Sequence, residues 1–326
     1  MMPGDMYDFN LNYIADTIKQ RRAKTVGLQF PSGFARLAIE ISGKIREQTG
    51  ATVVISANSC FGACDIDCGL LESVDLLFQF GHAEIPNLRV ENVVAIEVES
   101  AIDLHPVMEQ AIRVIGDRVG LLSTAQFVHR LPEVQRYLRE HGISGVISRG
   151  DARIAHPGLV LGCNFSSAAP DCDEYLYIGT GDFHALGVAL ATHKTVWIAD
   201  PAMNEIRKPD VDRVLRQRCA AIERALDAES VGIIISTKIG QFRGGLAFGL
   251  REMAEQHGLD AHILIADMVT PEALLPFDCD VFVSTACPRI AIDNTAIFRV
   301  PVLTPPEFEV AIGKRRWEDL VFDEIA

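Results

Sequence analysis

The chain has 326 residues, 48% of them hydrophobic, which is enough to bury more than one core and predicts a multi-domain globular protein. Acidic residues outnumber basic ones by 44 to 30, the formal net charge is −14, and no dense tract of Lys or Arg occurs. This balance argues against direct binding of nucleic acid, because neutralising phosphates requires a basic surface.

The first ten residues, M-M-P-G-D-M-Y-D-F-N, lack the charged and apolar regions of an export signal. No stretch reaches the roughly 18 consecutive apolar residues that cross a bilayer. We therefore expect a cytoplasmic protein with no membrane partner. In a reducing compartment, the eight cysteines are expected to be core residues, nucleophiles or metal ligands rather than disulfides.

Helices and strands are predicted to alternate along the chain in a pattern that occurs three times. Each time, an amphipathic helix precedes a strand that begins with Val-Gly, at Val26, Val119 and Val231. A second helix and further short apolar strands follow, which predicts mostly parallel sheets wrapped by helices. The predicted helices cover residues 9–21, 35–46, 105–115, 133–142, 211–226 and 247–258. The further strands cover residues 52–56, 76–80, 93–98, 159–162, 174–179, 195–200, 261–267, 280–285 and 300–304.

This pattern predicts three similar α/β domains with boundaries near residues 102 and 208, namely 1–102, 103–208 and 209–326. The nucleotide-binding patterns G-x-G-x-x-G and G-x-x-x-x-G-K-[ST] do not occur in the sequence. Gly179-Thr180-Gly181 follows a predicted strand, and it is either a strand-to-helix turn or a place where the backbone approaches a ligand.

One cysteine of each predicted domain follows a predicted strand: Cys60, Cys163 and Cys287. Ligands of open α/β sheets bind beyond the carboxyl ends of the strands. Three domains in a pseudo-threefold arrangement would point these cysteines toward one centre. Three thiolates suit an iron–sulfur cluster or, with a water, zinc, and three protein sulfurs leave the fourth iron of a cubane open. The alternative is three buried cysteines at strand ends.

Cys60, Cys64 and Cys68 are spaced four residues apart, which raises the alternative of a metal site within this run alone. In a helix, Cys60 and Cys68 would lie roughly 12 Å apart, too far for one compact cluster to bind all three cysteines. An irregular loop could wrap a cluster, although Asp65 and Asp67 favour the start of a helix. The spacing therefore leaves both alternatives open. The other cysteines are expected to fill core or surface positions, with Cys219 on the apolar face of its helix and Cys172 and Cys279 just before strands.

Five stretches together resemble the 2-(3-amino-3-carboxypropyl)histidine synthase family, which catalyses the first step of diphthamide biosynthesis. They are C-F-G-A-C-D-I-D, L-G-C-N, I-G-T-G-D-F-H-A-L-G, S-T-K-I-G-Q and T-A-C-P-R-I-A-I-D, and the resemblance covers nearly the whole chain. It implies three α/β domains around a central 4Fe-4S cluster in a homodimer. Carried over by motif, the cluster ligands are Cys60, Cys163 and Cys287, and Cys64 and Cys68 are not ligands.

The resemblance also implies a transferase that moves the 3-amino-3-carboxypropyl group of S-adenosylmethionine to imidazole C2 of a histidine in translation elongation factor 2. The family does this by a radical mechanism that needs an electron donor. We expect Arg289 to bind the S-adenosylmethionine carboxylate, because a guanidinium binds a carboxylate bidentately. Gln241, Lys238, His184 and the backbone at Gly181 are the further candidates.

Two other functions compete with this interpretation. Quinolinate synthase also arranges three α/β domains around a cluster held by one cysteine from each, but the T-A-C-P-R-I-A-I-D and G-T-G-D-F-H-A-L-G stretches argue against it. A non-catalytic iron–sulfur partner subunit is the second alternative. The presence of all three family cysteines argues against a degenerate subunit of that kind.

Overall fold

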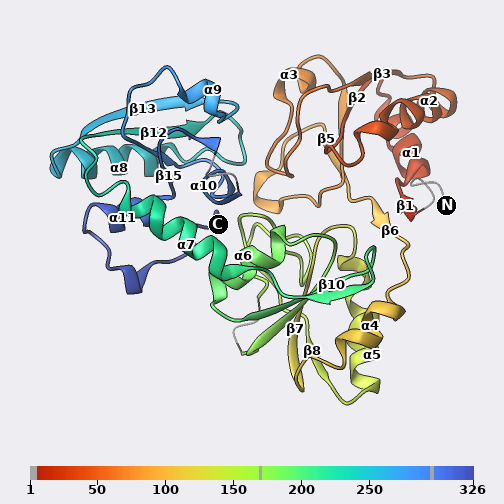
Figure 1. Ribbon diagram of the computed structural model, residues 1–326. Helices are drawn as coiled ribbons and strands as arrows, with labels where there is room; N and C mark the ends of the chain where they lie inside the picture. The colour runs from red at the N-terminus through yellow and green to blue at the C-terminus, as the bar shows by residue number, and fades with distance from the viewer. Residues whose placement is uncertain (1–5, 169–170, 294–296) are drawn as a thin grey trace. The chain divides into compact units, whose positions relative to one another are not determined.

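The computed structural model describes residues 6–168, 171–293 and 297–326 (Figure 1). Within these ranges the strands form three larger sheets and one two-stranded ladder, and the pairs in the larger sheets are parallel except at one edge. The prediction of an α/β fold with mostly parallel sheets is confirmed. Contacts divide the chain into two compact units. The first is Met1–Leu161, Phe165–Val188 and Thr192–Pro209, and the second is Gly162–Asn164, Ala189–Ala191 and Asp210–Ala326.

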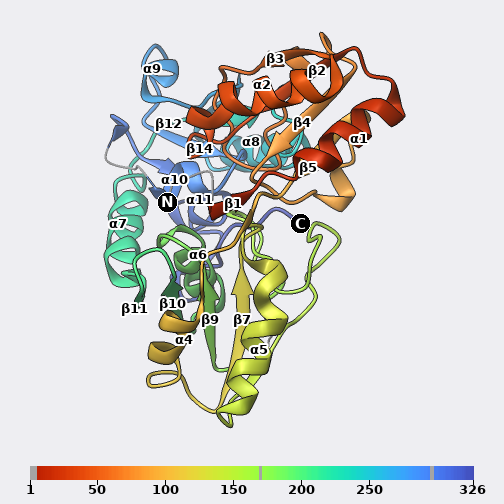
Figure 2. The ribbon, with the colours of Figure 1, turned by 90° about the vertical axis from the view of Figure 1, so that its right-hand side faces the viewer.

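The first sheet has the strand order β3-β2-β4-β5. Its strands are Thr25–Gln29 (β2), Thr52–Ile55 (β3), Leu76–Phe80 (β4) and Val93–Ile96 (β5). Helices Leu11–Arg21 (α1) and Ala38–Thr49 (α2) pack against each other beside this sheet (Figure 2). Both helices bury residues three or four positions apart, as the helical period requires. The short helix Cys68–Leu71 (α3) and the ladder of Tyr7–Asp8 (β1) with Glu99–Ser100 (β6) complete this region.

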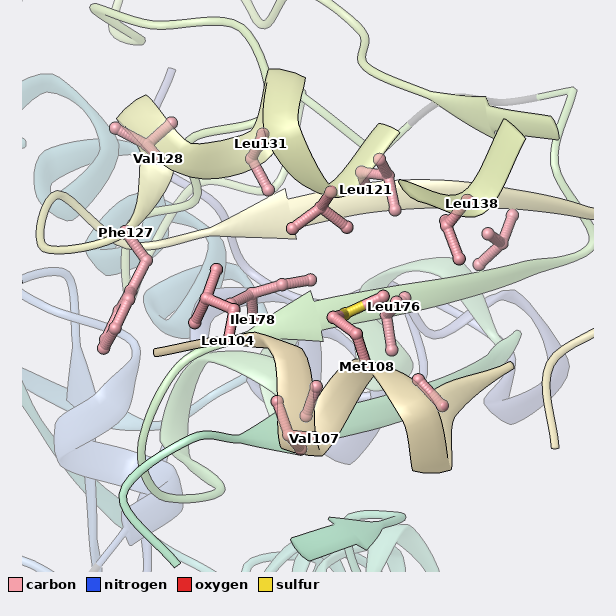
Figure 3. Packing of buried hydrophobic residues seen from close by; sticks show 14 of the residues in the cluster. Leu104, Val107, Met108, Leu121, Phe127, Val128, Leu131, Leu138, Leu176 and Ile178 are labelled. Atoms are coloured by element: carbon pink, nitrogen blue, oxygen red, sulfur yellow. The ribbon is translucent and has the colours of Figure 1, made fainter. Parts of the chain in front are cut away.

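The second sheet has the strand order β11-β10-β9-β7-β8. Its strands are Arg118–Ser123 (β7), Ser144–Val146 (β8), Glu174–Ile178 (β9), Thr195–Asp200 (β10) and the antiparallel Glu205–Arg207 (β11). Its helices are His105–Ala111 (α4), Leu131–Glu140 (α5) and Phe183–Thr192 (α6). Apolar side chains of α4 and α5 point toward β7 and β9 and form one buried cluster with them (Figure 3).

The third sheet, in the second unit, has the strand order β13-β12-β14-β15. Its strands are Ser230–Ser236 (β12), Asp260–Ala266 (β13), Val281–Ser284 (β14) and Val302–Leu303 (β15). Its helices are Val211–Glu223 (α7), Gly244–Gln256 (α8), Pro271–Leu274 (α9), Arg289–Asp293 (α10) and Pro305–Ala311 (α11). Single turns of 3₁₀ helix occur at Ala35–Leu37, Pro86–Leu88, Val128–Arg130 and Trp317–Asp319.

The glycine of each Val-Gly strand has the same packing role in all three sheets. A Cβ atom on Gly27 would lie 2.9 Å from Leu77, one on Gly120 would lie 2.5 Å from Tyr175, and one on Gly232 would lie 2.6 Å from Phe282. In every case the large residue is the glycine's direct partner on the neighbouring parallel strand. Because a side chain at any of these three glycines would force the large neighbour to move, the recurring glycine lets that neighbour lie across an inner strand of its sheet.

Two predictions about local structure are wrong. Residues 159–162 do not form a strand, although Leu159 makes an isolated parallel bridge with Ser123. The backbone turns directly before this stretch, at the left-handed Gly158. Cys219 is exposed rather than buried on the apolar face of its helix. The buried face of α7 contains Arg218 instead.

Arg218 is buried because its guanidinium is fully engaged. Nε and Nη2 donate to the two carboxylate oxygens of Glu307 at 2.7 and 2.6 Å, and the carbonyls of Ala291 and Val302 accept from the guanidinium. Glu307 also accepts from the backbone of Thr304 at the start of α11. One side chain on α7 therefore connects α10, β15 and α11.

The part of the chain that the structure describes contains no helix long and apolar enough to cross a membrane.

Replacing Arg218 by Ala is expected to lower the free energy of unfolding by about 3–5 kcal/mol, because it leaves the Glu307 carboxylate buried without its partner. The matched control is Arg316→Ala, whose ion pair with Asp319 is exposed to solvent, so this change should leave the free energy of unfolding close to that of wild type. Urea denaturation of both variants measures the difference. Equal losses of stability in the two variants would show that the buried ion pair of Arg218 with Glu307 does not stabilise the fold more than an exposed one.

Candidate functional site

Cys60 lies in a buried niche on the loop that follows β3, with 4% of its surface exposed. Gln79 Nε2 lies 3.7 Å from its sulfur, and the carbonyls of Gly62 and Asp65 and the Nδ1 atom of His82 lie at 3.9 Å. Burial, followed by the charge of Asp65, raises the pKa of Cys60 to about 12. Burial also lowers the pKa of His82 to about 4, so this imidazole is neutral at physiological pH. None of the described groups that shift the pKa of Cys60 is a cation, so a thiolate there would need the positive charge of a bound metal centre.

Two buried glutamines on adjacent strands hold the Cys60 loop. Gln29 on β2 and Gln79 on β4 are direct partners in the parallel register, and both donate to the carbonyl of Asp65, at 2.8 and 3.1 Å. The side-chain oxygen of Gln29 accepts from the backbone N–H of Asp67 at 3.3 Å. The carboxyl ends of the two strands therefore set the path of the loop. The sequence alone did not identify Gln29 and Gln79 as residues that hold the Cys60 loop. Their signal was a single polar residue in each of the otherwise apolar stretches V-G-L-Q-F and L-L-F-Q-F.

The helical alternative for residues 60–68 does not apply, because α3 begins only at Cys68. Asp67 caps this helix by accepting from the backbone N–H of Leu70, as its position before a helix predicted. Cys64 is buried near Cys60, whereas Cys68 is exposed. Across residues 6–168, 171–293 and 297–326, no three His, Cys, Asp or Glu side chains form a group that could hold a metal ion. Cys60, Cys64 and Cys68 thus form no such group by themselves.

Cys163 and Cys287 both belong to the second unit, and Cys60 belongs to the first. Cys163 is 5% exposed, and half-buried Cys287 lies three residues beyond β14 and two before Arg289. The guanidinium of Arg289 interacts electrostatically with both thiols. A nearby guanidinium favours thiolate over thiol, so these two cysteines suit an anionic cluster. The binding of one cluster by Cys60, Cys163 and Cys287 together stays a prediction of the sequence.

Arg289, predicted to bind a carboxylate, is buried and already pairs with one. Its Nη2 lies 2.6 Å from Oδ1 of Asp293 and its Nε lies 3.1 Å from Oδ2, both within α10. Burial lowers the pKa of Arg289, and the charge of Asp293 opposes that shift. Burial likewise raises the pKa of Asp293. The guanidinium edge formed by Nε and Nη2 is therefore engaged within the protein, which the sequence analysis did not foresee.

Lys238 and Gln241 lie in the turn between β12 and α8, in the same unit as Arg289. The Nζ atom of Lys238 lies 3.7 Å from Oδ1 of Asp267, which follows β13. Gln241 is 6% exposed, and its backbone N–H donates to the carbonyl of Lys238. Both residues thus follow the carboxyl end of a central parallel strand, where ligands of α/β sheets bind.

Gly181 and His184 follow β9 in the first unit, at the start of α6. Gly181 is exposed and has φ +72, a left-handed conformation that favours glycine. Its N–H donates to Oδ2 of the buried Asp200 at 3.3 Å. Arg207 on β11 forms ion pairs with the same Asp200 carboxylate and with Asp182, and so connects the turn after β9 to the neighbouring strands β10 and β11. Nδ1 of His184 lies 3.5 Å from the hydroxyl of Tyr177.

Two glycine substitutions are expected to shift stability in opposite directions. Gly181→Ala should lower the free energy of unfolding by about 1–2 kcal/mol, because the left-handed backbone strains any L side chain although there is space for it. Gly249→Ala, in the exposed interior of α8 and equally unobstructed, should raise it by about 0.5–1 kcal/mol. Thermal denaturation of both variants measures the signs. A stabilised Gly181→Ala variant would contradict this conformation of the turn.

Comparison with known proteins places the chain among enzymes of one pathway. The family model described as "Putative diphthamide synthesis protein" matches residues 30–321. A relative from Pyrococcus horikoshii named 2-(3-amino-3-carboxypropyl)histidine synthase is 34% identical, over 98% of this chain and 94% of the relative. A relative from Nematostella vectensis, named subunit 1 of that synthase, is 29% identical over 96% of this chain and 69% of the relative.

The same fold occurs in a solved structure. The crystal structure of Dph2 from Pyrococcus horikoshii with a 4Fe-4S cluster matches with a TM-score of 0.90 and 33% sequence identity. The match covers 98% of this chain and 94% of that chain. The agreement in sequence and in fold extends over nearly the full length of both proteins, so it is not limited to single motifs.

Proposed function

Since the chain belongs to the diphthamide synthesis protein family, we propose that it catalyses the first step of diphthamide biosynthesis. In this step, the enzyme transfers the 3-amino-3-carboxypropyl group of S-adenosylmethionine to imidazole C2 of a histidine in translation elongation factor 2. The observation that carries the proposal is the match in both sequence and fold to relatives named for this synthase and to Dph2 with a 4Fe-4S cluster. The family match also favours this function over a quinolinate synthase-like activity.

The proposed cluster ligands are Cys60, Cys163 and Cys287, one from each of the three predicted domains. Two features support them: the electrostatic interaction of Cys163 and Cys287 with the guanidinium of Arg289, and the burial of Cys60 in a loop that Gln29 and Gln79 hydrogen-bond. When bound, a reduced 4Fe-4S cluster supplies the electron for a radical cleavage of the sulfonium. The protein holds the thiols in place and excludes water from the Cys60 sulfur.

For S-adenosylmethionine, we propose contacts from Arg289, Gln241 and Lys238 in the second unit and from Gly181 and His184 in the first. Since Asp293 engages one edge of the Arg289 guanidinium, the substrate carboxylate would share this cation with Asp293 or displace it. Lys238 brings a second positive charge whose partner Asp267 is exposed and readily replaced.

The proposed partners follow from the reaction and the family. Elongation factor 2 is the protein substrate, a reductant donates the electron, and two copies of the chain form a homodimer. The acidic net charge of −14 supports the absence of nucleic-acid binding. We further propose that the protein works in the cytoplasm without a membrane partner.

Single Cys→Ala changes at all eight positions test the ligand set. After anaerobic reconstitution, the variants at Cys60, Cys163 and Cys287 should lose the brown chromophore and most of their iron and sulfide, because a ligand thiolate is missing. The other five variants should retain both and serve as internal controls. Chromophore loss on replacing Cys64 or Cys68, with retention on replacing Cys163 or Cys287, would refute this set.

Product analysis tests the reaction itself. The reconstituted enzyme, incubated with dithionite, S-adenosylmethionine and elongation factor 2, should release methylthioadenosine and modify one histidine of the factor. Arg289→Ala should bind S-adenosylmethionine about 10-fold or more weakly in calorimetry, because it removes charge-assisted hydrogen bonds. Arg316→Ala should bind it as wild type does, and Asp293→Asn at least as tightly. No methylthioadenosine from a fully loaded enzyme would contradict the proposed function.

A further inference from the structure

The segment 321–326 belongs to no helix or strand, yet it contacts the Cys163 loop directly and the backbone before Cys287 through Arg243. Asp323 and Ile325 are buried, whereas Glu324 between them and Ala326 after them are exposed. This alternation is that of an extended chain lying on a surface. None of these residues has a role in the reaction proposed above.

At one end, Asp323 reaches the backbone just before Cys287 through Arg243. Nε and Nη2 of Arg243 donate to the carbonyls of Thr285 and Ala286, at 2.7 and 3.0 Å. Nη1 and Nη2 donate to the two carboxylate oxygens of Asp323, at 2.8 and 2.6 Å. The side chains of Arg243 and Asp323 are 15% and 8% exposed, so the pair is shielded from solvent. A shielded bidentate pair holds its two partners in one fixed geometry.

At the other end, Ile325 forms hydrogen bonds with the Cys163 loop through both its backbone N–H and its backbone carbonyl. The N–H of Ile325 donates to the carbonyl of Cys163 at 2.8 Å. Its carbonyl accepts from Nδ2 of Asn164 at 3.0 Å. Asn164 is 1% exposed, so its amide needs such a partner inside the protein. The first of these hydrogen bonds engages the backbone of the cysteine itself, and the second engages the side chain of the next residue.

The two attachment points are close together. Residues 323 and 325 are separated by two steps of extended chain, which span at most about 7 Å. The Cys163 and Cys287 loops, distant in the sequence, are thus connected by a short segment that is hydrogen-bonded at Asp323 and at Ile325.

We propose that residues 323–325 are a brace that sets the relative position of the Cys163 and Cys287 thiols before a cluster binds. The ligand role of the two thiols rests on the proposed function, but the brace itself is a property of the folded protein without its cluster. Asp323, Ile325, Arg243 and Asn164 are positioning residues, because they act on the cysteines through the backbone. Groups that orient metal ligands in this way typically change metal affinity when they are replaced.

The brace is tested first in the full chain without its cluster, with a short bis-maleimide that joins neighbouring thiols. Mass spectrometry of the digest quantifies the peptide pair linked through Cys163 and Cys287. Ile325→Pro, which removes the N–H donor, and Asp323→Ala should each lower the yield of this pair about 5-fold or more. Ile325→Val, which keeps the donor and most of the buried side chain, and Asp319→Ala, which removes an exposed carboxylate, should keep the wild-type yield.

The second measurement is the loss of iron from reconstituted protein to a chelator. The Ile325→Pro and Asp323→Ala variants should lose iron about 10-fold or more faster than wild type, and the two control variants at the wild-type rate. Circular dichroism verifies that each variant is folded. If either variant does not fold, Asp323→Asn replaces it, because it keeps the volume of the side chain and removes the charge on which the bidentate pair with Arg243 depends.

The outcomes separate the brace from the proposed function. Wild-type cross-link yield in folded brace variants overturns the brace, whether or not the enzyme binds a cluster. In another outcome, the wild-type protein binds no cluster through Cys163 and Cys287, but the cross-link yield still falls in the Ile325 and Asp323 variants. This outcome overturns the proposed function and supports the brace. Reduced yield together with faster iron loss supports both.

Discussion

The close packing of parallel strands is the constraint on which the rest of this structure depends. In each larger sheet a glycine on an inner strand is covered by a large side chain from its direct partner, so these strands pack closely in the register that they adopt. A shift by one residue would turn the side chains of a strand to the opposite faces of the sheet. This register fixes where each strand ends, and the candidate residues lie on the loops that begin there.

Buried polar side chains then fix those loops. Gln29 and Gln79 hold the Cys60 loop, and Arg243 holds the backbone before Cys287. Each such group is costly to bury and is stable only with its full set of partners, so the loop it binds has one conformation rather than several. Precise loops are what a site assembled from distant segments needs, because a thiol that is misplaced by a small distance no longer binds the same cluster.

The strands and main helices were predictable because their signals are local. A run such as L-L-F-Q-F and the three- to four-residue apolar period depend only on neighbours in sequence. Short elements such as β8, β11 and α9–α11 lack such a period, and they form only because the surrounding chain supports them. Cys219 shows the same limit: the ion pair of Arg218 with the distant Glu307 turns α7 so that a charged residue is buried and the cysteine is exposed. The partners of site residues, Asp293 for Arg289 and Asp323 for Arg243, likewise required coordinates.

The most direct test of the central claim is anomalous X-ray diffraction at the iron edge from anaerobically grown crystals of the reconstituted protein. We expect one compact iron peak bonded to the sulfurs of Cys60, Cys163 and Cys287, with no bond to Cys64 or Cys68. Iron bonded within the 60–68 run alone, or far from Cys163 and Cys287, would contradict it.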